Sequence, residues 1–360
     1  MFLISSLSLH PFAPPSALQP LRETITVEPS AKSPRILVIR RDNIGDLVCT
    51  TPLIRALREQ LPGAYLAALV TRYNMAVLAR NPDIDALFSY TKTKHLEPGE
   101  SAIRILWDRL VTIWKLRRQR FDWILLPGGP QRSSLRFAKM IGAKQALVRD
   151  SEDAVGGPHH VEQCCHQLVR MGLRFQAPSA RLSPDTQLAS EIRRRFPAEW
   201  NLRKGPVIAL HLSARKPSQR WSVENFAALA RRLHQELDAK FLLLWSPGSA
   251  ENPTHPGDDE KAEAVLKATE GLPVHPVPTH RLEELIATLS LPDAIICSDG
   301  GTMHLAAALG KPMVTLFGDS DPEHWGPWQV PHITLHKPSR EVADISVDEV
   351  VAAFLSLPPC

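Results

Sequence analysis

Cysteines and long apolar runs are scarce in this sequence. There are five cysteines among 360 residues, and two of them, Cys164 and Cys165, are adjacent. This number and spacing provide no disulfide framework and indicate a reducing compartment. No apolar run approaches the roughly 20 residues that span a bilayer. The apolar start, residues 1–9, lacks a basic flank and a persuasive cleavage site, so we expect no signal peptide.

The excess of positive charge is also small. The 42 basic and 38 acidic side chains give a formal net charge of +4, which does not by itself indicate a nucleic-acid partner. No Gly-x-Gly-x-x-Gly motif follows the first expected strand of either half, which disfavours a nicotinamide dehydrogenase. No Asp-x-Asp pair is placed to hold Mg²⁺. We therefore expect no nucleic acid, no metal and no cofactor.

What the sequence does contain is a regular alternation of short apolar runs and amphipathic segments. This alternation predicts an α/β protein with parallel sheets. With 44% hydrophobic residues, the chain is long enough to bury two cores. We expect a flexible, proline-rich extension over residues 1–33, a first Rossmann-like domain over residues 34–180 and a second over residues 181–360.

Residues 293–318 predict one complete βαβ unit. Two apolar runs flank a short helix, and the polar turn Ser298–Thr302 joins the first run to that helix. Such turns lie at the carboxyl edge of a parallel sheet, where these sheets bind ligands. Gly300 and Gly301 let the backbone approach an anion. The helix opening adds unpaired N–H groups and the positive end of the helix dipole, so a phosphate would fit there.

The same turn could be an ordinary βα connection in which Asp299 or Thr302 caps the helix. That interpretation does not account for His304, which lies one turn into the helix beside the same edge. An aspartate, two glycines, a threonine and a histidine provide more polar chemistry than a cap requires. We therefore predict a ligand site at this edge.

A similar turn lies near the amino end. The apolar run over residues 35–40 leads through Ile44-Gly-Asp46 into an amphipathic helix that we expect to end near Gln60. The helix opening stabilises negative charge, so Asp46 should be ionised and able to accept a proton. A Gly-Asp pair before a helix is often only a cap, and this alternative stays open.

The loop over residues 127–134 should face the same cleft as Asp46. Its Arg132 and Ser134 are therefore candidates for binding an anionic acceptor. The preceding helix, residues 103–118, contains two tryptophans and ends in a basic cluster. The cluster is either an interfacial membrane patch or a solvated helix end that complements its own dipole, and the sequence favours the second.

The second half has its own candidates for holding a nucleotide. The loop after the strand at 207–210 carries Ser213, Lys216 and Arg220 before a helix opening, and its cations could pair with a diphosphate. Asp258 precedes a later helix and could accept hydrogen bonds from ribose hydroxyls. A carboxylate that complements the helix opening explains Asp258 equally well.

Residues 156–173 contain three histidines and two cysteines, which suggests zinc. His160 and Cys164 would share one helix face, but no second pair has the spacing that a four-ligand site needs. A helix crossing between the domains, with the cysteines as small core residues, explains the segment better.

Together these motifs resemble glycosyltransferase family 9, the ADP-heptose:lipopolysaccharide heptosyltransferases. The resemblance covers about residues 34–330. The matching features are Ile-Gly-Asp46 followed by Thr-Thr-Pro-Leu, His159-His-Val-Glu162, Gln-Arg-Trp221, and Asp299-Gly-Gly-Thr-Met-His304 with Pro312 and Gly318. It implies the GT-B architecture, in which two Rossmann-like domains face each other across a cleft.

The resemblance also implies roles for individual residues. Asp46 would be the general base. Asp299 and the two glycines after it would bind the donor sugar and phosphates, and Asp258 would hold the ribose. The family commonly has lysine where this chain has Gln219, so Lys216 or Arg220 would supply that charge. It also commonly has threonine or serine at the position of Gly300.

The activity that the resemblance implies is inverting, metal-independent transfer of heptose from ADP-heptose to a lipopolysaccharide-core glycolipid. The enzyme would be cytoplasmic, with a peripheral contact to the inner membrane surface. Two alternatives stay open, a nucleotide-sugar epimerase of the same architecture and a non-catalytic nucleotide-binding module.

Overall fold

The computed structural model describes residues 33–91, 102–149, 157–202, 204–251 and 257–358. The extension expected over residues 1–33 lies outside this range except for its last residue. Within the described residues, no helix is both long and apolar enough to cross a bilayer.

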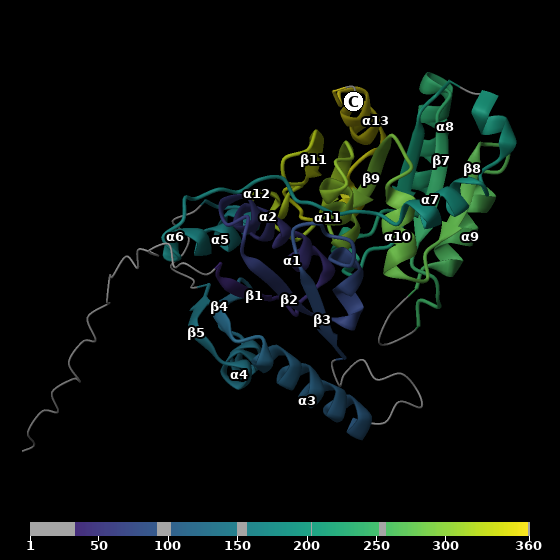
Figure 1. The fold of residues 1–360 in the computed structure, drawn as a ribbon. Helices are drawn as coiled ribbons and strands as arrows, with labels where there is room; N and C mark the ends of the chain where they lie inside the picture. Colours follow the sequence, from purple (N-terminus) through teal and green to yellow (C-terminus); the bar gives the residue numbers. More distant parts are fainter. Residues whose placement is uncertain (1–32, 92–101, 150–156, 203, 252–256, 359–360) are drawn as a thin grey trace, which may run out of the picture.

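The first half of the chain forms a five-stranded parallel sheet with the strand order β3-β2-β1-β4-β5 (Figure 1). Its central strands are almost completely buried, as expected for a parallel sheet that is covered on both faces. The strands are β1 (Arg35–Ile39), β2 (Tyr65–Thr71), β3 (Ala86–Tyr90), β4 (Phe121–Leu126) and β5 (Ala143–Val148). In the central register Val38 pairs with Ala68 on one side and with Leu125 on the other.

The helical segments of this half are α1 (Ile44–Val48), α2 (Thr51–Gln60), the 3₁₀ turn η1 (Arg72–Val77), α3 (Ala102–Arg118), α4 (Arg132–Ile141), α5 (His160–Cys165) and α6 (Gln167–Arg170). The single helix expected to reach Gln60 is broken between α1 and α2. Pro52 explains the break, because it has no N–H to donate to the carbonyl of Val48. The Thr51 hydroxyl donates to that carbonyl instead, at 2.8 Å.

The second half forms a six-stranded parallel sheet with the order β11-β10-β9-β6-β7-β8. Its strands are β6 (Val207–His211), β7 (Lys240–Trp245), β8 (Val274–Pro278), β9 (Ala294–Ser298), β10 (Met313–Phe317) and β11 (His332–His336). Its helical segments are α7 (Thr186–Arg193), η4 (Ala198–Leu202), η5 (Pro217–Gln219), α8 (Val223–Leu237), α9 (Asp259–Ala268), α10 (Leu282–Leu289), α11 (Gly301–Ala308), α12 (Pro322–Trp325), η6 (Val342–Asp344) and α13 (Val347–Leu355). The predicted βαβ unit is confirmed as β9-α11-β10.

The chain does not cross between the sheets as a helix. Both α5 and α6 contact the first domain, α5 through α2 and α6 through β5. Residues 173–185, which form neither helix nor strand, carry the chain over to α7 (Figure 1). The prediction of a helix that crosses between the domains is therefore wrong, although both cysteines of α5 are buried as expected.

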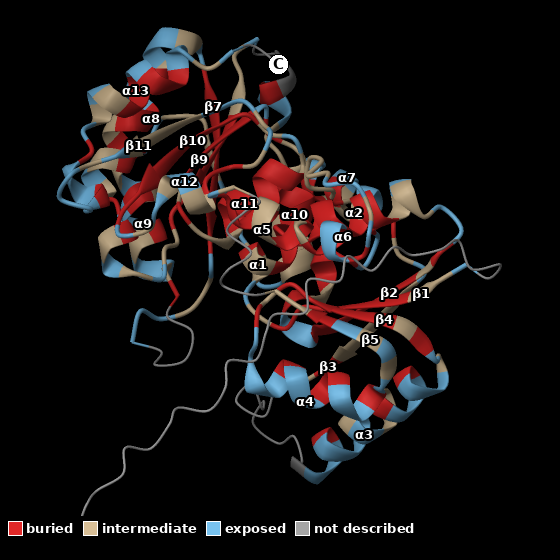
Figure 2. Cartoon of the chain, turned by 90° about the vertical axis from the view of Figure 1, so that its left-hand side faces the viewer, coloured by how far each residue is buried: buried red, intermediate tan, exposed pale blue. Residues whose placement is uncertain are grey.

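The two domains meet where α1 approaches α11, between the buried strands of the two sheets (Figure 2). Leu47 of α1 and Leu305 of α11 belong to one continuous apolar cluster. Gly45 makes the close approach possible, because a Cβ atom there would lie 2.5 Å from Cδ2 of His304. The N-termini of these two helices therefore face a common space between the domains.

Candidate active site

Two pockets open at the junction of the domains, and Asp46 lines both of them. The larger pocket has a volume of about 620 Å³ and the smaller about 360 Å³. Asn43 and Trp325 also belong to both linings. Asp46 thus belongs to the part of the wall that the two pockets share.

The larger pocket gathers most of the residues that the sequence predicts for the donor. Its lining includes seven of them: Ser213, Lys216, Asp299, Gly300, Gly301, Thr302 and His304. Two other predicted residues lie elsewhere. Arg220 is not part of the lining, and its Nε donates to the carbonyl of Ala214 at 3.1 Å. Asp258 is not part of it either; it is the N-cap residue of α9, and its own N–H donates to the carbonyl of Ser246 at 2.9 Å.

Asp299 is held by Gln219. The Gln219 side chain is buried, and its Nε2 donates to Oδ2 of Asp299 at 2.7 Å and lies 3.3 Å from the Ser320 hydroxyl. A lysine at this position would form an ion pair with Asp299, whereas glutamine makes a neutral hydrogen bond that adds no positive charge. The cations that line this pocket are instead Arg215, Lys216 and Arg281.

The buried histidines of the larger pocket are neutral. Burial lowers the pKa of His211 to about 4, so its Nε2 can share a hydrogen bond with the Thr302 hydroxyl at 3.1 Å. Burial likewise lowers the pKa of His304, whose Nδ1 lies 3.6 Å from Sγ of Cys49. Positive potential in this pocket therefore comes from the N-terminus of α11 and from the three cations, not from histidine.

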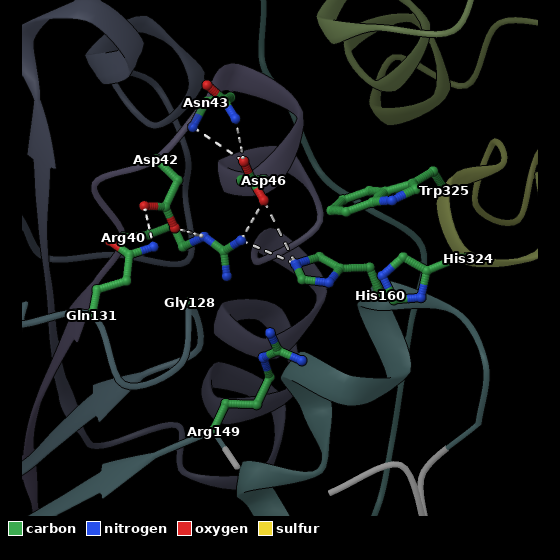
Figure 3. Close-up of a pocket in the computed structure, with 10 residues that line it drawn as sticks. All are labelled: Arg40, Asp42, Asn43, Asp46, Gly128, Gln131, Arg149, His160, His324 and Trp325. Atoms are coloured by element: carbon green, nitrogen blue, oxygen red, sulfur yellow. Dashed lines mark hydrogen bonds and ion pairs between the residues drawn. The ribbon is translucent and has the colours of Figure 1, made fainter. Parts of the chain in front are cut away.

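The carboxylate of Asp46 makes two kinds of contact, one with each oxygen (Figure 3). Its Oδ2 accepts from the backbone N–H of Asn43 at 3.1 Å and from the Asn43 side chain at 2.9 Å, which caps α1. Its Oδ1 accepts from Nη2 of Arg40 at 2.6 Å. The capping interpretation is therefore correct for Oδ2, while Oδ1 is held by Arg40.

Arg40 organises this side of the site. Its side chain is 2% exposed, and its Nε lies 3.1 Å from a carboxylate oxygen of Asp42. Its Nη2 also lies 3.0 Å from Nε2 of His160. Burial, with a further contribution from Arg40, lowers the pKa of His160 to about 2, so the ring is neutral. Because a guanidinium can only donate, Nε2 of His160 accepts from Arg40. The 3.8 Å approach of His160 to Asp46 is consequently not an ion pair.

The smaller pocket has a charged and aromatic lining, part of which the sequence interpretation did not find. Arg149 enters it from the end of β5, and His324 and Trp325 enter from α12 in the second domain (Figure 3). The Trp325 ring lies 4.5 Å from that of His160. The predicted acceptor residues do not line it, because Arg132 is exposed at the start of α4 and Ser134 is buried within that helix.

Among the described residues, no group of three or more His, Cys, Asp or Glu side chains could hold a metal ion. An Asp-x-Asp sequence does follow β10 near the larger pocket. Its Asp321 accepts from the N–H of Glu323 and so caps α12. Its Asp319 lies 3.9 Å from Nζ of Lys216 and 3.8 Å from Nη1 of Arg340.

Two parallel-sheet domains with a polar cleft between them form a fold of the GT-B type. The structure is similar to that of "the glycosyl transferase family 9 from Veillonella parvula", with a TM-score of 0.76 and 20% identity over 91% of this chain and 98% of that one. It is also similar to E. coli heptosyltransferase WaaC with ADP-2-deoxy-2-fluoro heptose, with a TM-score of 0.67 and 16% identity over 89% and 98% of the chains.

The model of glycosyltransferase family 9 (heptosyltransferase) matches residues 114–347, and the chain belongs to this family. The lipopolysaccharide heptosyltransferase 2 of Salmonella typhimurium is 25% identical over 310 residues, which cover 81% of this chain and 85% of that protein. The predicted family, the GT-B fold and glycosyltransferase activity are thereby confirmed.

Proposed function

We propose that the protein transfers heptose from ADP-heptose to a glycolipid of the lipopolysaccharide core, with inversion and without a metal ion. The observation that carries this proposal is the position of Asp46 on the wall shared by the two pockets. A transferase needs a base between its donor and its acceptor, whereas a binding module does not. The names of the relatives support the donor and acceptor classes.

In this proposal the larger pocket binds the donor. Its volume of about 620 Å³ lies within the range of about 300–1,000 Å³ that is usual for small-molecule sites. The diphosphate would lie at the N-terminus of α11, where Gly300 and Gly301 leave the backbone N–H groups accessible. Lys216 and Arg281, which also line this pocket, would add positive charge. Asp299, held by Gln219, would accept hydrogen bonds from sugar hydroxyls.

The smaller pocket would bind the acceptor sugar. Arg149, the cation of this lining that is not paired with Asp42 or Asp46, suits an anionic acceptor, and Trp325 provides an apolar face for a sugar ring (Figure 3). Nε of Arg149 donates to the carbonyl of Pro127 at 2.9 Å and its Nη1 to Gln163 at 2.7 Å, which orient the guanidinium. Arg132 and Ser134 stay predictions for contacts farther along the acceptor.

The proposed reaction is a single displacement. The acceptor hydroxyl oxygen forms a bond to the anomeric carbon while the bond from that carbon to the diphosphate breaks, and ADP leaves. Asp46 takes the hydroxyl proton, and such general-base assistance contributes about 10²- to 10⁴-fold. Negative charge that develops on the departing diphosphate is stabilised by the positive N-terminal end of α11 and by Lys216.

The direct test of this function is a transfer assay with ADP-heptose and a lipopolysaccharide-core acceptor. We expect heptosylated acceptor by mass spectrometry, with an anomeric configuration opposite to that of the donor. ADP-, UDP- and GDP-sugars compared by thermal shift would show which donor binds. Conversion of the donor to an epimer without any acceptor would instead identify an epimerase.

Metal independence has its own test. The positive end of α11, with Lys216 and Arg281, can stabilise the leaving diphosphate without a divalent cation. We expect full transfer activity in excess EDTA. Activity that is lost in EDTA and restored by Mg²⁺ would contradict this part of the proposal.

Gln219 offers a change that should improve donor binding. In the Gln219→Lys variant a charge-assisted contact to Asp299 or to phosphate replaces a neutral hydrogen bond, so we expect the donor KM to fall about fivefold. Gln219→Ala removes the donor to Asp299 and should raise the same KM. The acceptor KM should stay the same in both variants. Equal donor KM values in all three proteins would exclude this role for position 219.

A further inference from the structure

Helix α3 exposes an unusually apolar face to solvent. Seven of the eleven large apolar side chains exposed among the described residues lie on α3 and its neighbour α4. Five of them are on α3: Ile103, Leu106, Trp107, Leu110 and Trp114. Trp107 is 66% exposed and Ile103 is 81% exposed. We call this set the α3 apolar face.

The α3 apolar face is a single stripe along the helix. Its members follow the spacing i, i+3, i+4, i+7 and i+11, which places them on one side of an α-helix. The opposite side, with Ile105, Ile113 and Leu116, is buried. The helix therefore has two apolar sides, one in the core of the first domain and one in solvent, and the second belongs to none of the apolar clusters of the described residues.

Positive charge surrounds the stripe. The two helices α3 and α4 contain eight Lys and Arg side chains and one acidic side chain, Asp108. Their combined charge of +7 exceeds the +4 of the whole chain, so the remainder is net negative. The Arg118 guanidinium lies 4.6 Å from the centre of the Trp114 ring, and the Arg117 side chain binds the carbonyl of Met140 in α4. The charge is therefore concentrated where the apolar side chains are exposed.

Helices α3 and α4 lie where a second phase, such as a membrane, can reach them. In both views α3 and α4 form the end of the molecule away from the second sheet (Figures 1 and 2). Gln131, the N-cap residue of α4, lines the smaller pocket. Helix α4 contacts α3, and Arg132, Leu135 and Met140 are exposed along it.

We infer that the α3 apolar face and the cations of α3 and α4 are a docking surface for an anionic lipid bilayer. Tryptophan and aliphatic side chains flanked by Lys and Arg are suited to the boundary between headgroups and acyl chains. A solvated basic helix end, which the sequence favours, would not need exposed Trp107 and Trp114. Only the purpose of this docking rests on the proposed function. That purpose is to bring the smaller pocket to a lipid-linked acceptor.

The test is co-sedimentation of the full chain with vesicles of phosphatidylglycerol and phosphatidylcholine, without donor or acceptor. We expect binding to these vesicles, much weaker binding to vesicles of phosphatidylcholine alone, and release at about 1 M salt. The Trp107→Ser/Trp114→Ser double variant should bind at least about tenfold more weakly. The control Leu355→Ser, a similarly exposed position on α13, should bind like the wild type.

Binding that is unchanged in the double variant, or absent in the wild type, would overturn the inference. The inference would also be overturned if the wild type formed a dimer in solution and the double variant were a monomer, because a second copy would then cover the α3 apolar face. Transfer to a delipidated, soluble acceptor should be equal in the wild type and the double variant. If that transfer is absent from both while vesicle binding stands, the proposed function fails and the docking surface does not.

Discussion

Replacement of Asp46 by asparagine should lower kcat for heptose transfer by about 10²- to 10⁴-fold, which is the usual contribution of a general base. Asparagine has nearly the same shape and can still accept from Asn43 to cap α1, so the fold should be retained. It cannot take the proton of the acceptor hydroxyl. The donor KM should change little, because the predicted phosphate contacts lie on α11 and on the loop after β6. Initial rates with varied donor at saturating acceptor measure both quantities.

Asp42→Asn is the matched control for this prediction. Asp42 pairs with the same arginine, since Nε of Arg40 lies 3.1 Å from it, and it also lines the smaller pocket. It does not reach the larger pocket, so it cannot contact donor and acceptor together. We expect its loss to lower kcat by less than about tenfold. Equal loss in both variants, or an Asp46→Asn variant as active as the wild type, would exclude Asp46 as the base.

Replacement of Arg40 by methionine should have the second largest effect, as Arg40 is a positioning residue. Without it, Oδ1 of Asp46 loses its 2.6 Å partner and Nε2 of His160 loses its donor. A carboxylate that is free to rotate is a poorly oriented base, and we expect kcat to fall about 10- to 100-fold. The donor KM should stay the same. Arg40→Lys, which keeps the charge, should recover part of the lost rate.

A purely structural role for Arg40 predicts a different result. Arg41 is also buried, and its side chain binds the Tyr90 hydroxyl away from both pockets. Arg41→Met should therefore lower the free energy of unfolding, as Arg40→Met should, by about 1–3 kcal/mol. It should leave kcat of the folded enzyme near the wild-type value. If both variants reduced kcat equally, the position of Asp46 would not depend on Arg40.

Local sequence signals were sufficient for the parts of the fold that are buried on both sides. The run from Ala294 to Phe317 predicted β9, α11 and β10 because apolar strands, a polar turn and a short helix follow one another without interruption. The edge strand β5 (Ala143–Val148) has no such signal, since its residues alternate between partly buried and exposed. Helix α10 (Leu282–Leu289) was not predicted either, although its Ile286 and Leu289 are buried in the core.

The parts of the site that lie in turns could be predicted from the sequence. The parts that depend on contacts between residues far apart in the sequence could not. Asp299 directly follows β9 and Asp46 lies in the first turn of α1, the helix that follows β1, and the structure brings both to the larger pocket. Arg40 and His160 are 120 residues apart, and neither sequence neighbourhood indicates the other. His160 suggested a zinc ligand because the partner that explains its burial, Arg40, is not visible from its own segment.

A crystal structure of the Asp46→Asn variant with ADP-2-deoxy-2-fluoro heptose would show whether this side chain lies between donor and acceptor. We expect the diphosphate at the N-terminus of α11 and the anomeric carbon within about 6 Å of the residue 46 side chain, which leaves room for one acceptor oxygen between them. The face of the sugar opposite the diphosphate should be open to the smaller pocket. A nucleotide-sugar bound outside the larger pocket, or one whose anomeric carbon faces away from residue 46, would exclude Asp46 as the base.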